Sequence, residues 1–318
     1  MLSILLSILY RFSKFKRGEY PLSILYYHHV FNTTESYHPD DLCAQQFEQQ
    51  IAFLTKHFHL LTLTEALSLL KQKKLPPKAL VISFDDGYQD NANVAAPLLR
   101  KYQCPATFFI ATEGVETGVL WNDKIEQCIK HTQATKISAK YLGKSLPLSS
   151  ESEKISAYHQ LVSKLKFEPN EQRTALIQQL ISELQVTQFT RTMMTEQQIK
   201  QLSKQQFEIG AHTHSHTIVA TESAQSAQQE LQQNKLKLEA ITAQPISLLA
   251  FPNGLFGRDY LQQHCELAKQ LGFEAAFSTN DGGATSNTNL FQIPRFMPYR
   301  KQLPLFALSI AKIAGDHA

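Results

Sequence analysis

The sequence predicts an α/β fold built around a parallel sheet that is either open or closed into a barrel. Seven short runs are rich in β-branched, aromatic or other apolar residues, which favours strands. Most segments between them repeat apolar residues at helical spacing, and strands that alternate with helices are typical of parallel sheets. The chain of 318 residues is long enough for a domain of this kind. The predicted strands cover residues 22–27, 80–84, 106–110, 207–211, 246–251, 274–278 and 291–296.

Residues 1–20 are predicted to form an N-terminal amphipathic segment. Its apolar part is about half as long as a membrane span, and basic residues follow it rather than precede it. This order, with no small-residue cleavage site behind it, disfavours a secretory signal. We expect the segment to pack on the protein, with peripheral contact to an anionic membrane as the alternative. A cytoplasmic location, or one peripheral to the inner membrane, is therefore favoured.

Four of the intervening segments show a clear helical stripe of apolar residues. The stripes consist of Phe47, Ile51 and Leu54; of Leu63, Ala66, Leu67 and Leu70; of Val94, Leu98 and Leu99; and of Leu231, Leu238 and Ile241. Residues 113–205 are too long and too polar for a simple strand-to-helix connection. We predict that they form a helical insertion carried on a loop of the sheet. Trp121, the only tryptophan, begins this insertion and is either a sugar-stacking platform or a core anchor.

The composition excludes some classes of function. The 31 basic and 28 acidic residues are nearly balanced, and aromatic residues do not alternate with Lys or Arg, so we predict no nucleic-acid partner. The four cysteines are scattered without a C-x-x-C pair, which indicates single buried thiols rather than a disulfide framework.

Two adjacent carboxylates, Asp85 and Asp86, follow an apolar run and precede Gly87. Neighbouring carboxylates repel each other, so keeping both ionised in a partly buried place costs free energy unless a cation offsets the repulsion. The alternative is a solvated Asp-Gly turn.

A second polar group provides the side chains for such a cation. His212 and His216 are four residues apart, which places both imidazoles on one side of a helical turn. Both polar groups follow predicted strands, where barrel active sites lie. Two imidazoles and one carboxylate form a three-ligand site with open coordination positions. This set suits a divalent metal such as Zn²⁺, while Co²⁺, Ni²⁺ or Fe²⁺ would also fit.

Three stretches carry a family resemblance: S-F-D-D-G-Y at 83–88, H-T-H-S-H at 212–216 and A-F-P-N-G at 250–254. In this order they resemble the polysaccharide deacetylases of the NodB-homology type, carbohydrate esterase family 4. The resemblance implies a single-domain, deformed (β/α)7 barrel over residues 21–318, apart from the insertion. It also implies metal-dependent hydrolysis of the N-acetyl amide of amino sugars in a glycan.

Carried over residue by residue, the resemblance implies that the metal ligands are Asp86, His212 and His216. Asp85 would be the general base that takes the proton from the attacking water. A backbone N–H near Asn253 would stabilise the oxyanion. Tyr88 and Trp121 are further candidates for contact with substrate.

Two departures from the family pattern bear on the remaining roles. The third motif lacks its usual arginine, and we expect Arg295 to replace it and to lower the pKa of Asp85 by pairing with it. The alternative is a surface arginine. The late leucine-x-histidine motif is also missing, but Tyr27 and His28 resemble the early Tyr-His of the circularly permuted branch typified by poly-N-acetylglucosamine deacetylases. His28 would then protonate the leaving amine, unless it is a structural strand histidine.

Other substrates and another class of function stay open. The same site could serve an O-acetyl esterase or the deformylation of a lipid-linked sugar. The atypical third motif and the missing late histidine also allow a catalytically silent glycan-binding module. The expected partner in each case is an acetylated glycan or a lipid-linked sugar.

Overall fold

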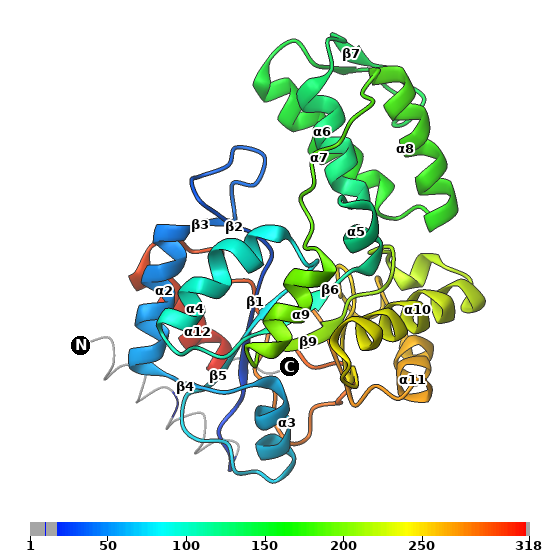
Figure 1. The fold of residues 1–318 in the computed structure, drawn as a ribbon. Helices are drawn as coiled ribbons and strands as arrows, with labels where there is room; N and C mark the ends of the chain where they lie inside the picture. Colours follow the sequence, from blue (N-terminus) through cyan, green and yellow to red (C-terminus); the bar gives the residue numbers. More distant parts are fainter. Residues whose placement is uncertain (1–9, 11–17, 316–318) are drawn as a thin grey trace.

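A curled parallel sheet of seven strands forms the centre of the structure, a computed structural model that describes Tyr10 and residues 18–315 (Figure 1). Six strands follow the order β1-β5-β6-β9-β10-β11, and β4 pairs with β5. The strands are β1 (Ser23–Tyr27), β4 (His59–Leu60), β5 (Ala79–Phe84), β6 (Thr107–Ile110), β9 (Glu208–Ala211), β10 (Leu248–Ala250) and β11 (Ala275–Phe277). All their pairings are parallel, which confirms the predicted α/β fold of the deformed-barrel type.

The prediction of a strand at residues 291–296 is wrong, but the segment lies beside the sheet where a seventh strand was expected. Ile293 makes an isolated parallel bridge to Phe277 of β11, and Phe296 makes another to Leu25 of β1. The segment therefore links the two edge strands of the sheet. Pro294 between the two bridges has no backbone N–H, which explains why no continuous ladder forms. The seventh strand of the sheet is instead the two-residue β4, which the sequence did not predict.

The two faces of the sheet carry separate hydrophobic clusters, because successive residues of a strand point to opposite sides. On β5, Val81 belongs to the inner cluster and Ile82 to the outer cluster. The inner cluster also contains Phe109, Phe277 and residues of α3. The outer cluster contacts the helices that cover the sheet. Residues on the Val81 side of β5 consequently lie inside the curled sheet.

The four predicted helical stripes are confirmed. They lie on α2 (Ala44–His57), α3 (Leu63–Lys71), α4 (Ala96–Lys101) and α10 (Ala224–Thr242). A π-helical turn, Asn91–Ala95, precedes α4 and contains Val94 of the third stripe. Two further helices, α11 (Gln262–Gln270) and α12 (Leu303–Gly315), complete the cover. In Figure 1, α2, α4 and α12 lie to the left of the sheet and α10 and α11 to its right, and all five helices contribute residues to the outer cluster.

The insertion carries most of its helices away from the sheet. It contains α5 (Thr112–Thr117), α6 (Trp121–His131), α7 (Glu151–Leu165), α8 (Asn170–Leu184), α9 (Glu196–Lys204) and the antiparallel pair β7 (Lys136–Ile137) and β8 (Leu146–Pro147). Helices α6, α7 and α8 share a hydrophobic cluster of their own, which Tyr37 joins from the loop between β2 (Val30–Phe31) and β3 (Leu42–Cys43). Figure 1 shows these three helices beyond one end of the sheet. Helix α9, in contrast, buries Ile199 in the outer cluster.

Tyr10 is the described part of the predicted N-terminal segment that precedes Gly18. It is buried, its ring meets that of Phe58 edge-on, and its hydroxyl lies 3.1 Å from Ser23 Oγ. This contact fits packing on the protein, whereas residues 1–9 and 11–17 lie outside the described part of the chain. Among the described helices, none is both long and apolar enough to cross a membrane.

Gly210 of β9 provides a test of the packing inside the sheet. A Cβ at this position would lie 2.5 Å from Phe109 Cε1 and 3.2 Å from the Leu248 carbonyl oxygen. Because Phe109 also packs on Phe277, its ring has little room to move. We expect Gly210→Ala to lower the free energy of unfolding by about 1–3 kcal/mol, measured by urea denaturation.

Gly114→Ala is the matched control for this substitution. The nearest atoms to its new Cβ would be Met193 Cγ at 2.9 Å and Leu120 Cδ2 at 3.0 Å, which belong to flexible side chains rather than to an aromatic ring or the backbone. Alanine is also favoured over glycine in a helix by up to about 1 kcal/mol. Equal losses of stability in the two variants would contradict the packing described for β6 and β9.

Candidate active site

Asp85 and Asp86 lie in a buried turn at the carboxyl end of β5. Their exposed fractions are 2% and 4%, so the alternative of a solvated turn is wrong. Asp85 continues the alternation of Val81 and Ser83 and points inside the sheet. Asp86 and Gly87 have φ values of +73° and +90°, which turn the chain sharply away from the strand. A Cβ at Gly87 would lie 2.7 Å from Ile110 Cγ2, so the turn requires glycine on two counts.

The predicted pair between Asp85 and Arg295 is present and is bidentate. Arg295 Nη1 and Nη2 each lie 2.7 Å from one carboxylate oxygen of Asp85. The guanidinium is fully buried, which rules out the surface-arginine alternative, and its Cζ lies 4.7 Å from the Tyr26 ring centroid. Burial is the largest single effect and would raise the pKa of Asp85, but the charge and hydrogen bonds of Arg295, together with the charges of His212 and His28, leave this pKa below its usual value. Asp85 is thereby kept ionised.

Asp86 lies against both predicted histidines. Its Oδ1 is 3.2 Å from His212 Nε2 and 3.0 Å from His216 Nε2. One potential ligand atom from each of the three residues lies within 4.8 Å of the others. Asp86 Oδ1 is also buried without a hydrogen-bond partner of good geometry among the described residues. A divalent cation between the three side chains would satisfy this oxygen, so the residues present fit a metal.

The surroundings of His212 orient its ring for such a role. His212 Nδ1 lies 2.7 Å from the carbonyl oxygen of Ala250, to which it can only donate a hydrogen bond. This donation leaves the lone pair on Nε2, the atom that faces Asp86. Thr213 and His216 have φ values of +60° and +52°, an uncommon backbone conformation for residues with side chains.

Asn234 of α10 holds this loop and was not predicted from the sequence. Its Oδ1 accepts a 3.1 Å hydrogen bond from the backbone N–H of His212. Its Nδ2 donates to the carbonyl oxygens of Ile110 and Thr213 at 2.9 and 2.6 Å. It thus joins the carboxyl ends of β6 and β9. The available signal was its place between Leu231 and Leu238 on an apolar helical stripe, where an asparagine is out of place.

His28 and His29 follow the end of β1 and contact different groups. The His28 ring meets Tyr26 edge-on at 5.6 Å, and a charge on His28 lowers the pKa of both Asp85 and Asp86. His28 therefore lies on the side of the paired carboxylates. Nδ1 of His29 lies 2.6 Å from Asp90 Oδ2. Although burial lowers the pKa of His29, the charge and hydrogen bond of Asp90, with the charges of Asp41 and Asp123, raise it to about 9.

The residues predicted to contact substrate differ in exposure. Trp121 is only 6% exposed and its indole N–H donates to the His216 carbonyl oxygen at 3.2 Å, which favours the core-anchor alternative over sugar stacking. Tyr88 is also buried, and its hydroxyl is bonded within the protein. Asn253 is half-buried at the end of β10, where its Oδ1 accepts a 3.0 Å hydrogen bond from Lys166 of the insertion.

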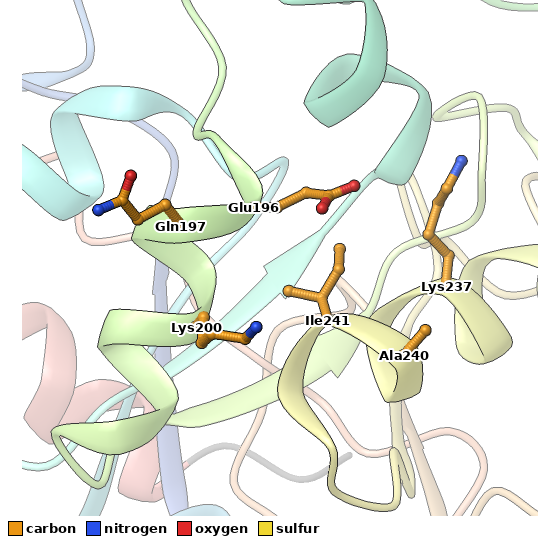
Figure 2. Close-up of a pocket in the computed structure, with 6 residues that line it drawn as sticks. All are labelled: Glu196, Gln197, Lys200, Lys237, Ala240 and Ile241. Atoms are coloured by element: carbon orange, nitrogen blue, oxygen red, sulfur yellow. The ribbon is translucent and has the colours of Figure 1, made fainter.

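A groove elsewhere on the surface is separate from these residues. It lies between α9 and α10 and has a volume of about 500 Å³ (Figure 2). Its lining consists of Glu196, Gln197, Lys200, Lys237, Ala240 and Ile241. None of them is a predicted site residue, so the groove does not change the assignment of the site.

Comparison with known sequences points to one family. A family model described as polysaccharide deacetylase matches residues 72–276. YxkH of Bacillus subtilis, which is named as a polysaccharide deacetylase, is 22% identical over 276 residues, or 86% of this chain and 70% of that protein. The poly-β-1,6-N-acetyl-D-glucosamine N-deacetylase of Staphylococcus aureus is 36% identical over 85 residues, which cover 26% of this chain and 29% of that protein.

Solved structures share the fold. The Streptococcus pyogenes deacetylase PplD, in complex with acetate, superposes with a TM-score of 0.59 at 18% identity, over 87% of this chain and 92% of that chain. IcaB from Ammonifex degensii gives a TM-score of 0.56 at 17% identity, over 93% and 98% of the two chains. At these identities the likeness concerns the fold, and it agrees with the deformed barrel described above.

The lowered pKa of Asp85 predicts a specific loss of stability in acid. The usual pKa of an aspartate in an unfolded chain is about 4. Just below this pH, Asp85 becomes protonated in the unfolded chain but stays ionised in the folded protein, where its pKa is lower. The contribution of the Asp85–Arg295 pair is therefore present above that pH and is lost as the pH falls. We expect the metal-free Asp85→Asn variant to be less stable at neutral pH, because Arg295 is left unpaired, and to lose less further stability on acidification than the wild type.

The measurement is the free energy of unfolding of metal-free protein in urea at a series of pH values. Asp40→Asn changes an exposed aspartate and is the matched control, with a pH dependence close to that of the wild type. If Asp85→Asn and the wild type lose stability in parallel, the buried pair does not have the assigned effect.

Proposed function

Because this chain belongs to the polysaccharide deacetylase family, we propose that it is a metal-dependent hydrolase that removes N-acetyl groups from amino sugars in a glycan. The observation that carries this proposal is that the two adjacent carboxylates have different partners. Asp86 faces His212 and His216, while Asp85 is held separately by Arg295. These different partners support the proposal that one carboxylate is a metal ligand and its neighbour the general base.

Asp86, His212 and His216 would hold the metal. Two imidazoles and one carboxylate suit Zn²⁺, with Co²⁺, Ni²⁺ and Fe²⁺ as alternatives. When bound, a divalent cation supplies Lewis-acid stabilisation to the acetyl carbonyl and makes water easier to deprotonate. The hydrogen bond from His212 Nδ1 to Ala250 fixes the ring so that Nε2 is free for this purpose.

Asp85 is the proposed general base. Its pairing with Arg295 keeps it ionised, and an ionised carboxylate can accept the proton of the attacking water. Each of its oxygens accepts one hydrogen bond from Arg295, which leaves further lone pairs available. Arg295 thus positions the Asp85 carboxylate and helps to keep it ionised, and it takes no part in the proton transfer itself.

His28 is the proposed general acid, and Asn253 marks the proposed oxyanion site. His28 follows the end of β1, and its charge lowers the pKa of both carboxylates, which supports a role in delivering a proton to the leaving amine. A backbone N–H near Asn253, at the end of β10, would stabilise the developing oxyanion. An N-acetylated amino sugar as substrate is supported by the name of the Staphylococcus aureus relative.

Loss of any one of the three ligands should remove metal and activity together. We expect Asp86→Ala, His212→Ala and His216→Ala each to lose bound metal and to release no acetate from an N-acetylated oligosaccharide. The measurement combines metal analysis of the purified proteins with assays for acetate and for the new free amine.

His214→Ala is the matched control in the same loop. The His214 ring lies 2.9 Å from Thr112 Oγ1 and 3.1 Å from Gln233 Nε2, away from Asp86, so this variant should keep its metal. Near wild-type turnover in all three ligand variants would refute the assignment. Acetate released without a free amine would indicate ester hydrolysis instead.

Asp85→Asn should separate the base from the ligands. The amide cannot accept the proton, so kcat should fall by about 10²–10⁴-fold while the metal content stays at the wild-type level. The same assays measure both quantities. Loss of metal together with turnover would place Asp85 among the ligands, and unchanged turnover would show that another group is the base.

A further inference from the structure

The first turn of α6 in the helical insertion touches both chain segments that carry the metal ligands. Trp121, Asn122 and Asp123 form this turn. One of the two segments is the loop from His212 to His216, and the other is the turn from Asp85 to Tyr88. The turn of α6 bonds directly to a backbone carbonyl of the first segment and to the Tyr88 hydroxyl of the second, and each contact can be removed separately.

Trp121 and Arg173 hold the histidine loop. The indole N–H of Trp121 donates to the His216 carbonyl oxygen at 3.2 Å, and Arg173 Nη2 of α8 donates to the Ser215 carbonyl oxygen at 3.0 Å. The Arg173 guanidinium also lies 4.7 Å from the Trp121 ring centroid, so the two donors support each other. Both side chains are buried. Like Asn234 in α10, Arg173 occupies the buried stripe of its helix, with Ile177 and Leu180.

These two hydrogen bonds hold a residue whose backbone conformation is unfavourable. His216 has a φ of +52°, a conformation that costs free energy for a residue with a side chain and persists only when its surroundings hold it. Two donors from the insertion bind the carbonyl oxygens of this residue and of the one before it. They fix the direction from which the His216 ring approaches Asp86.

Asn122 and Asp123 hold the other segment through Tyr88. Asn122 Nδ2 donates to the Tyr88 hydroxyl at 2.8 Å, and that hydroxyl donates to Asp123 Oδ1 at 3.3 Å. The other oxygen of Asp123 accepts hydrogen bonds from Thr192 Oγ1 and from the backbone N–H of Leu120. Tyr88 is thus tied into the start of α6, two residues after Asp86.

We propose that Trp121, Asn122, Asp123 and Arg173 are positioning residues that make the helical insertion part of the metal centre. Through them the insertion sets the separation of Asp86 and His216 and thereby the affinity for the metal. This inference rests on the metal site of the proposed function, but not on the identity of the substrate.

Two conservative variants test the two sets of hydrogen bonds separately. Trp121→Phe keeps a ring for Arg173 and removes the indole N–H, and Tyr88→Phe removes the hydroxyl bonded to Asn122 and Asp123. We expect each to weaken Zn²⁺ binding by about tenfold, as is typical for partners that orient metal ligands. Affinity is measured by competition with a chromophoric chelator. The d–d absorption of the Co²⁺-loaded proteins should also change, since it reports ligand geometry.

Tyr141→Phe is the matched control. The Tyr141 hydroxyl donates to Glu183 at 3.2 Å within the insertion, so this change also removes one partly buried hydrogen bond, but away from the metal ligands. We expect its Zn²⁺ affinity to equal that of the wild type, even if its melting temperature falls.

The outcomes separate this inference from the proposed function. Wild-type Zn²⁺ affinity and Co²⁺ spectrum in Trp121→Phe and Tyr88→Phe would overturn the inference and leave the metal site intact. A wild-type protein that binds none of Zn²⁺, Co²⁺, Ni²⁺ and Fe²⁺, or whose metal binding survives Asp86→Ala, would instead overturn the metal site. If Trp121→Phe does not fold, as judged by circular dichroism, Tyr88→Phe decides the question.

Discussion

Two neighbouring buried carboxylates set the electrostatic constraint on which the rest of the site depends. Each needs its own positive partner, because burial makes an unpaired charge costly. Asp85 finds its partner within the chain, in the forked guanidinium of Arg295. Asp86 faces two imidazoles instead and keeps an unsatisfied oxygen that suits a bound cation. This difference between the partners supports the different chemical tasks proposed for the two identical side chains.

Those parts of the site that depend on local spacing could be predicted from the sequence. Asp85 with Asp86, and His212 with His216, are close in sequence and follow recognisable strands. The pairing of Arg295 was expected only because a motif arginine was missing. The roles of Asn234 and Arg173 were not predicted, because their hydrogen bonds join segments that lie far apart in the chain. Both nevertheless occupy apolar helical stripes, and a polar residue in such a stripe is a readable sign of a buried role.

The fold was predictable wherever apolar runs are long. Strands β1, β5, β6 and β9 follow their predicted ranges closely, whereas β4 has two residues and no pattern that marks it. The segment at 291–296 has strand-like composition, yet Pro294 restricts it to isolated bridges. Trp121 shows a further limit. Composition alone does not distinguish a tryptophan that stacks on a sugar from one whose indole N–H is used inside the protein.

The pair of Asp85 and Arg295 also has a consequence for biosynthesis. The two residues are separated by 210 positions, so the ribosome makes β5 and Asp85 long before it makes the cation that neutralises Asp85. Until then, burying Asp85 would leave its charge unpaired, which favours keeping the end of β5 hydrated. The growing chain therefore gains its closed interior late, when the segment around Arg295 joins β1 to β11. Assembly of the reactive centre and completion of the domain become the same event.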